Sequence, residues 1–334
     1  MRRLARQIRR DEEGVASTVG TMMALLVFLT FLSLITNQYV PVWMNDSEAS
    51  HMNGALGQFS TLKGAIDLQG LASQAAGSEY VPTTAASAVT LGLDGVPIFS
   101  SPTVGQLSSN PDAGPFTVTF DYSILAPSGT AFRTRVREQS NGSIVLDVLN
   151  RYAPPEKVVF ENGAVIRSQS DGQVVRAQPA FLVTETNNTL AVRFDLVTLY
   201  GRGFVTGTST EVVNTRLFAS DVQTYDRFPS DAVIWINHTS AYGLAWYQFL
   251  NATLSNSLNL GGTYVSTPLD QSFTARVGAA VVYKITVSFL PARNEYITRL
   301  EVHNNPGVLS LATFRLRHLQ VQVGIGEAPE DILK

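Results

Sequence analysis

A long uncharged segment near the N-terminus constrains this chain more than any other feature. No Asp, Glu, Lys or Arg occurs between Glu13 and Asp46, and the stretch from Val15 to Ile35 is apolar or small almost throughout. Since about 20 helical residues cross a hydrocarbon core of ~30 Å, this length fits one membrane crossing. The sequence therefore predicts a transmembrane helix over residues 15–40, embedded in a lipid bilayer.

Arginines in front of this segment set its predicted orientation. The basic positions are Arg2, Arg3, Arg6, Arg9 and Arg10. Because basic residues beside a span stay in the cytoplasm, residues 1–14 are expected to form a cytoplasmic leader. The expected location is the cell membrane, as a single-pass protein whose C-terminal domain, from Asp46 onward, is extracellular. Tyr39 and Trp43 follow the span, where aromatic side chains favour the outer interface.

The apolar segment allows two other interpretations. A buried core helix is disfavoured because a soluble fold seldom encloses such a segment behind an arginine cluster at its end. A secretory signal peptide has a shorter apolar region, of ~7 to 15 residues, and a small-x-small cleavage site after it. Here residues 36–41 read Thr-Asn-Gln-Tyr-Val-Pro, a poor match. A retained anchor is the better prediction.

The residues around the start of the apolar segment carry a family resemblance. The sequence of residues 11–21 is Asp-Glu-Glu-Gly-Val-Ala-Ser-Thr-Val-Gly-Thr. It resembles the N-terminus of archaeal type IV pilin-like surface proteins, on the strength of Gly14, Val15 and the Gly20-Thr21 pair. The resemblance implies that a prepilin peptidase cuts between Gly14 and Val15 and leaves the helix in the mature protein. Ser17 and Val19 depart from the pattern, where many relatives have proline and bacterial pilins have glutamate.

A second resemblance lies further along the chain. Residues 159–166 read Val-Phe-Glu-Asn-Gly-Ala-Val-Ile, and Asp171-Gly172 follows. This is similar to uncharacterised archaeal envelope proteins that have an N-terminal pilin-like anchor and a similar "ENGA" turn in their β domains. An ordinary uncleaved anchor explains the N-terminal segment equally well.

An amphipathic helix is predicted after the span, over residues 45–70. Pro41 should break or kink the helix that leaves the membrane. The apolar positions then recur at helical spacing and form one stripe. They are Met52, Ala55, Leu56, Phe59, Leu62 and Ile66. The stripe is expected to pack on its own domain, although pairing with neighbouring subunits is also open. Residues 71–84 are rich in Gly, Ala and Ser and are expected to form a hinge.

The remaining chain is predicted to be mainly β, an extracellular antiparallel β-sandwich region over residues 85–326. Alternating apolar and polar residues predict strands at 116–122, 144–149, 190–196 and 281–289. Asx-Gly pairs at Asp94, Asn141, Asn162 and Asp171 predict hairpin turns. One inserted helix is expected from Ser240 to Leu258. A composition shift at 224–231 leaves one or two β units open, and 327–334 is expected to be a solvated tail.

The last strand pattern, residues 313–323, changes polarity along its length. Phe314 and Leu316 lie on one face of the strand, whereas Leu319, Val321 and Val323 lie on the other. This swap near His318 predicts a bulge or an edge position.

Composition and motifs argue against several functions. The chain has no cysteine, which excludes disulfides, thiolate nucleophiles and cysteine-ligated metals. Of 24 basic and 27 acidic residues, five and three fall in the first thirteen positions, which leaves 19 against 24 and no basic face for nucleic acid. No hydrolase, zinc-peptidase or nucleotide-binding motif is present. We therefore expect no enzyme activity and no cofactor.

Candidate metal ligands are sparse in the sequence. The histidines are His51, His238, His303 and His318. They lack ligand spacing, so each is interpreted as an ordinary polar residue. Asp226 and Asp231 bracket a loop, but the repeated acidic pattern of a calcium loop is missing. A solvated loop is the expected outcome.

Five N-x-Ser/Thr sequons are candidate glycosylation sites. They begin at Asn45, Asn141, Asn187, Asn237 and Asn251. Each accepts a glycan only on an extracellular surface loop. Asn187, in a polar loop, and Asn141, beside a turn, are the strongest candidates.

Three functions are compatible with these patterns. The first is a pilin-like surface protein, processed at Gly14 and assembled with other pilin-like subunits as a minor filament component or surface adhesin. The second is an uncleaved envelope protein that binds a cell-surface or extracellular ligand. The third is a membrane-tethered hydrolase, which requires paired carboxylates ~5 to 9 Å apart in a cleft.

Overall fold

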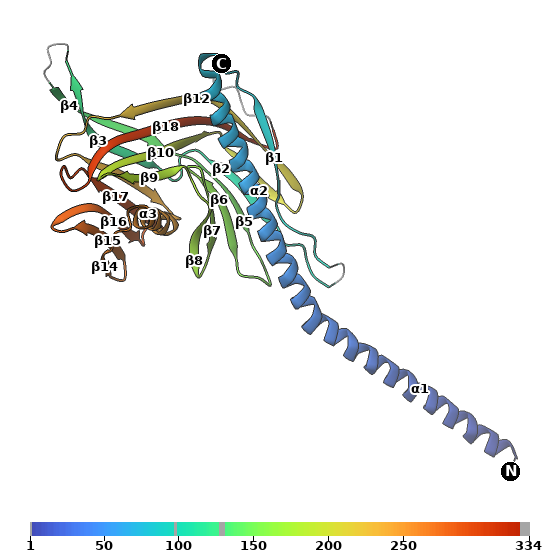
Figure 1. Ribbon diagram of the computed structural model, residues 1–334. Helices are drawn as coiled ribbons and strands as arrows, with labels where there is room; N and C mark the ends of the chain where they lie inside the picture. The colour runs from blue at the N-terminus through green and yellow to red at the C-terminus, as the bar shows by residue number, and fades with distance from the viewer. Residues whose placement is uncertain (1, 97–98, 127–130, 328–334) are drawn as a thin grey trace.

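The fold is that of a computed structural model, which describes residues 2–96, 99–126 and 131–327. A long N-terminal helix leads into a region of three β-sheets, and the N-terminal end of the helix projects away from the sheets (Figure 1). Helix α1 spans Arg2–Leu34, and helix α2 spans Val40–Ala76. The chain is mainly β, as predicted from the alternating sequence patterns.

Pro41 does not break the helix, which was one of the two outcomes predicted from the sequence. A π-helical turn, η1 (Ile35–Tyr39), joins α1 to α2, and the N–H of Val40 donates to the carbonyl of Ile35. In an α-helix the proline ring clashes with the carbonyl four residues earlier, and the proline has no N–H to donate. The wider π turn accommodates both defects, so the helical path continues without interruption.

Helix α2 buries the predicted apolar stripe. All six of its residues, Met52 to Ile66, are buried in the structure, so the stripe serves as core for the chain's own β region. The predicted hinge at 71–84 is wrong in its first half, because α2 continues to Ala76. Only the short 3₁₀ turn η2 (Gly77–Glu79) and the extended residues 80–83 separate the helix from the first strand.

The strands form three sheets. The five-stranded sheet has the order β1 (Thr84–Thr90), β12 (Thr210–Tyr225), β18 (Ser310–Ile325), β10 (Thr189–Tyr200), β9 (Phe181–Thr186). The six-stranded sheet has the order β11 (Gly203–Gly207), β2 (Gly105–Asn110), β5 (Ser143–Val148), β6 (Glu156–Glu161), β7 (Ala164–Gln169), β8 (Gly172–Ala177). The seven-stranded sheet has the order β14 (Gly262–Ser266), β15 (Asp270–Val277), β16 (Ala280–Leu290), β17 (Glu295–His303), β13 (Val233–Ser240), β3 (Phe116–Leu125), β4 (Ala131–Ser140).

The four predicted strands are all present, as β3, β5, β10 and β16. The predicted hairpins are only half correct. Asn162-Gly163 turns β6 into β7 with positive φ at both residues, and a tight turn at Asp171 joins β7 to β8. Asn141 instead links β4 to β5, and Asp94 lies between β1 and β2. The strands of each pair belong to different sheets, so an Asx-Gly pair there marks a crossing between sheets.

Strand β18 is central, so the predicted edge position is wrong. It pairs with β12 on one side and, in parallel, with β10 on the other. Its polarity changes because it serves two cores: Phe314 and Leu316 enter one core, whereas Leu319 to Val323 enter the other through the opposite face. The bulge expected near His318 lies instead on the partner strand β12, between Leu217 and Ala219.

The two cores are distinct in composition. The first contains α3 (Gly243–Leu258), which is the predicted inserted helix, with Trp246 fully buried. The second contains the stripe of α2 packed on the five- and six-stranded sheets. Segments 85–223 and 232–326 both contribute to the first core, where Phe120 and Phe314 have ring centroids 5.2 Å apart. The core therefore does not divide at 224–231. Of the predicted tail at 327–334, only Glu327 lies within the described residues.

Candidate functional site

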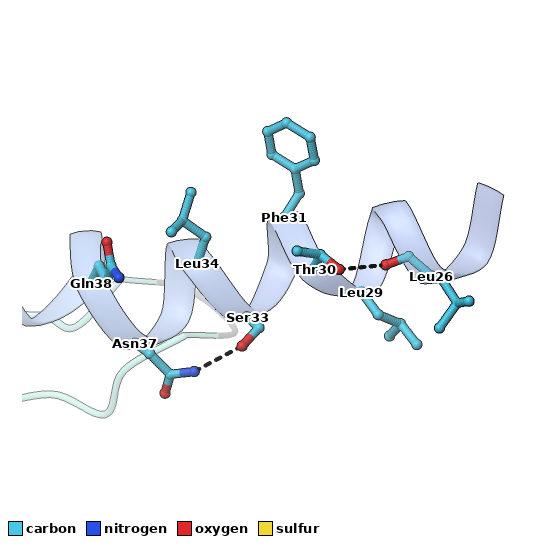
Figure 2. Close-up of a pocket in the computed structure, with 8 residues that line it drawn as sticks. All are labelled: Leu26, Leu29, Thr30, Phe31, Ser33, Leu34, Asn37 and Gln38. Carbon is cyan, nitrogen blue, oxygen red and sulfur yellow. Dashed lines mark hydrogen bonds between the residues drawn. The ribbon is translucent and has the colours of Figure 1, made fainter. Parts of the chain in front are cut away.

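The apolar half of the long helix is not covered by any other part of the chain that the structure describes. Phe31 is 62% exposed. Other large apolar residues between Val19 and Leu34 are also exposed, and they lie on all sides of the helix. Figure 2 shows apolar side chains of this helix pointing outward in different directions, with Phe31 and Leu34 on one side and Leu26 and Leu29 on the other. This is the single helix among the described residues that is long and apolar enough to cross a membrane. It is a candidate membrane span.

Polar side chains in this stretch are bonded within the helix. The hydroxyl of Thr30 donates to the carbonyl of Leu26 (2.8 Å), and the hydroxyl of Thr36 donates to the carbonyl of Leu32 (2.9 Å). The Asn37 amide donates to the Ser33 hydroxyl at 3.1 Å (Figure 2). Since lipid offers no hydrogen-bond partners, such internal pairing lowers the cost of placing these groups in a bilayer.

Two aromatic residues follow the apolar stretch at helical spacing. Tyr39 and Trp43 are about half exposed, and their ring centroids lie 5.9 Å apart. An exposed pair of amphipathic rings fits the boundary between lipid and water.

A buried carboxylate fixes α2 to the β region. Glu48 is fully buried, and its Oε2 accepts hydrogen bonds from the backbone N–H groups of Tyr152 (2.8 Å) and Ala153 (2.7 Å). Its Oε1 accepts from the Arg151 N–H (3.0 Å) and the Thr103 hydroxyl (2.7 Å). Burial opposes ionisation, but these four donors outweigh it and hold the pKa of Glu48 below its usual value.

Side-chain amides make a second attachment. Gln69 accepts a hydrogen bond from the Leu217 N–H (2.8 Å) and donates one to the Thr215 carbonyl (3.0 Å). Both residues are neighbours of Arg216, which pairs with Thr84, the first residue of β1. Gln58 binds both the N–H and the hydroxyl of Thr90. The sequence patterns did not predict a role for these residues. Glu48 lies four residues before Met52 and therefore on the same face of the helix as the apolar stripe. A charged residue on that face was the sequence signal for a buried carboxylate.

A polar cleft of about 540 Å³ lies between the six-stranded sheet and the start of α3. At its floor, Glu161 is fully buried and accepts from the Ser240 hydroxyl and the Trp246 indole N–H, each at 2.9 Å. His238 Nε2 also lies 2.9 Å from this carboxylate. The carboxylate thus sits between hydroxyl and imidazole, whereas a catalytic triad needs the imidazole beside the hydroxyl.

The "ENGA" turn is a buried junction. The side-chain oxygen of Asn162 accepts from the Ser140 hydroxyl (2.9 Å) and the Val197 N–H (2.8 Å). This one amide therefore connects β4, the β6–β7 turn and β10, which belong to three different sheets.

The predicted processing site lies inside α1. Gly14 and Val15 are both helical, within the continuous run that begins at Arg2.

The sequons fall into two groups. Asn45, on α2, and Asn187, in the β9–β10 turn, are exposed. Asn141, Asn237 and Asn251 are half-buried. Asn237 accepts from Arg299 (3.0 Å) in the central strand β13, and Asn251 on α3 accepts from the Tyr283 hydroxyl (3.1 Å).

The candidate metal ligands are not brought together. Within residues 17–96, 99–126 and 131–327, no group of three or more His, Asp or Glu side chains could hold a metal. His238 stacks on Phe116 with ring centroids 3.8 Å apart, and His51 donates to the Thr90 carbonyl. Asp231 forms an ion pair with Arg133 at 2.9 Å, so the negative charge of its carboxylate already has a partner. The other histidines, His303 and His318, lie beside Glu301 and Thr198.

Comparison with known proteins gives a distant relationship. No family model matches the chain. An uncharacterised protein of Archaeoglobus fulgidus is 22% identical over 220 residues, which cover 60% of this chain and 35% of that protein. The match thus spans about a third of the length of that relative.

Proposed function

We propose that this chain is a membrane-anchored, type IV pilin-like surface protein that serves as a minor filament subunit or an adhesin. In this proposal the helix from Val15 crosses the bilayer, the arginines stay in the cytoplasm, and the β region, arranged as a β-sandwich, lies outside the cell. The observation that carries the proposal is the apolar helix that projects uncovered from the sheets while its direct continuation, α2, is fixed into their core.

The fixed position of α2 supports a retained helix. Glu48 and Gln69 attach α2 at two separate points, and the π turn keeps the path from α1 continuous. A signal segment removed after secretion has no need of this continuity. The pilin-like class itself is supported by Gly14, Val15 and the Gly20-Thr21 pair at the head of the apolar stretch.

The size of the β region supports a minor subunit or adhesin. The stripe of α2 is used by the chain's own core, whereas the apolar side chains of α1 from Val19 to Leu34 are exposed and free to contact lipid or other subunits. An uncleaved single-pass protein that binds an extracellular ligand is the alternative, and the polar cleft favours it.

N-terminal mapping by mass spectrometry tests the proposal. The protein is purified from the membrane of a host that carries a prepilin peptidase, beside a Gly14→Ile variant. We expect wild type to begin at Val15 and the variant to retain Met1. Filament imaging follows that result. A wild-type chain that keeps Met1 in this host overturns the pilin-like assignment and leaves the uncleaved anchor.

A further inference from the structure

The polar cleft continues onto an open face of the six-stranded sheet. Gln106 and Ser108 of β2 and Asp147 of β5 line the cleft, whereas Leu107 and Leu146 point into the second core on the other face. In antiparallel pairs, residues directly opposite each other share a face. The pairs Gln106–Asp147 and Asp147–Lys157 therefore form one polar row across three strands.

An exposed aromatic ring extends this face. Phe204, on the edge strand β11, lies directly opposite Ser108 and is 65% exposed. Its neighbour Val205 packs on the second core, so Phe204 is on the cleft side of the sheet. A solitary exposed phenylalanine beside a polar row is an apolar platform next to hydrogen-bonding groups, the usual composition of a small-molecule site.

The floor and far wall of the cleft are built from buried groups. A side chain on Gly114 would place its Cβ 2.2 Å from Glu161 Oε2, so only glycine leaves the carboxylate in position. Tyr242 also lines the cleft, and burial together with Glu161 and Asp147 raises the pKa of its phenol, which stays protonated.

Three of the four carboxylates that line the cleft are paired or hydrogen-bonded within the protein. Asp147 forms an ion pair with Lys157 at 2.7 Å, and Asp112 pairs with Arg202. Glu161 is satisfied by its buried donors. A charged ligand would have to displace these partners or rely on Arg293 and Glu295, which also line the cleft, whereas hydroxyl groups can both donate to the carboxylates and accept from the amides.

We infer that this cleft binds a neutral oligosaccharide, with one sugar ring stacked on Phe204 and its hydroxyl groups hydrogen-bonded to Gln106 and Asp147. This gives the adhesin of the proposed function a ligand class and rests on that function, since a saccharide partner requires the β region to lie outside the cell.

Binding to the full-length chain in detergent micelles tests the inference. An array of neutral gluco-, manno-, galacto- and N-acetylglucosamine tetrasaccharides is screened, and the strongest binder is titrated by calorimetry. We expect saturable binding that weakens at least tenfold in Phe204→Ala and in Asp147→Asn. The matched control is Phe132→Ala, because Phe132 is 57% exposed on β4, outside the cleft, and its loss should leave affinity unchanged.

Several results would overturn the inference. These are no binding of any neutral saccharide, affinity retained by correctly folded Phe204→Ala and Asp147→Asn, or a preference for charged peptides over every saccharide on the array. Because purified protein is used, failure here leaves the N-terminal mapping untouched. Equally, a retained Met1 leaves a positive saccharide titration standing.

Discussion

The carboxylate of Glu48 accepts a hydrogen bond from the backbone N–H of Ala153 at 2.7 Å, which ties helix α2 to a loop 105 residues further along the chain. Tyr152, Arg151 and Thr103 supply the other donors to this carboxylate. A buried carboxylate with four donors is stabilised as the anion, and the same bonds satisfy three backbone groups that would otherwise lack partners.

Glu48→Ala should destabilise the β region by about 3 kcal/mol, because it leaves buried N–H groups without an acceptor and opens a cavity. The measurement is chemical denaturation of the purified chain followed by near-ultraviolet circular dichroism. Asp46→Ala is the control, since Asp46 is exposed two residues away and should shift the midpoint little. Equal stability of the two variants would remove the structural role assigned to Glu48.

The contribution of Glu48 should depend on pH in a defined direction. Its pKa is depressed in the folded state, so the stabilisation is present above the usual value of 4.5 and is lost as pH falls through the lower folded value. We expect the Tm difference between wild type and Glu48→Gln to be constant above about pH 5 and to shrink in acid. A difference that grows on acidification would contradict this sign.

Asn162→Ala should cost about 2 to 4 kcal/mol. The substitution removes an acceptor shared by Ser140 and Val197 and places alanine at φ 43°, a left-handed conformation that asparagine tolerates better. Thermal unfolding of the variant is the measurement. The control is Asn188→Ala, which also has positive φ (60°) but lies in an exposed turn, so it isolates the backbone effect from the lost hydrogen bonds. Matching Tm shifts would show that the junction contributes nothing.

Asn187 should be the most heavily occupied sequon in a host that glycosylates surface proteins. Its side chain is exposed in the β9–β10 turn, whereas Asn237 sits in a central strand and bonds to Arg299. An oligosaccharyltransferase needs access to the side-chain amide, which the exposed turn gives. Glycopeptide mass spectrometry of the membrane-purified protein compares the two sites. A glycan on Asn237 and none on Asn187 would reverse the expected order.

Local patterns predicted the elements whose signal lies within a few turns or strand positions. The stripe from Met52 to Ile66 repeats at the helical period, and the strand at 281–289 alternates at the strand period. Each pattern depends only on which side of a single element is buried. The inserted helix around Trp246 was found in the same way.

Pairings between distant segments were beyond such patterns. Asn141 and Asn162 are both followed by glycine, yet only Asn162 closes a hairpin, because the strands that flank Asn141 join different sheets. The polarity change of β18 reflected two cores on opposite faces, which a single strand cannot reveal.

The sequence by itself determined the long apolar helix, the mainly β character and the inserted helix, because periodicity and charge-free length are local properties of the chain. Only the tertiary structure decided that a π turn precedes Pro41 and keeps the helix continuous. It also decided that Glu48 receives hydrogen bonds from residues 103 and 151–153, and that Phe204 lies opposite Ser108 of the polar cleft. These features depend on register between segments far apart in the chain. Their energy comes from contacts that exist only once the sheets have assembled.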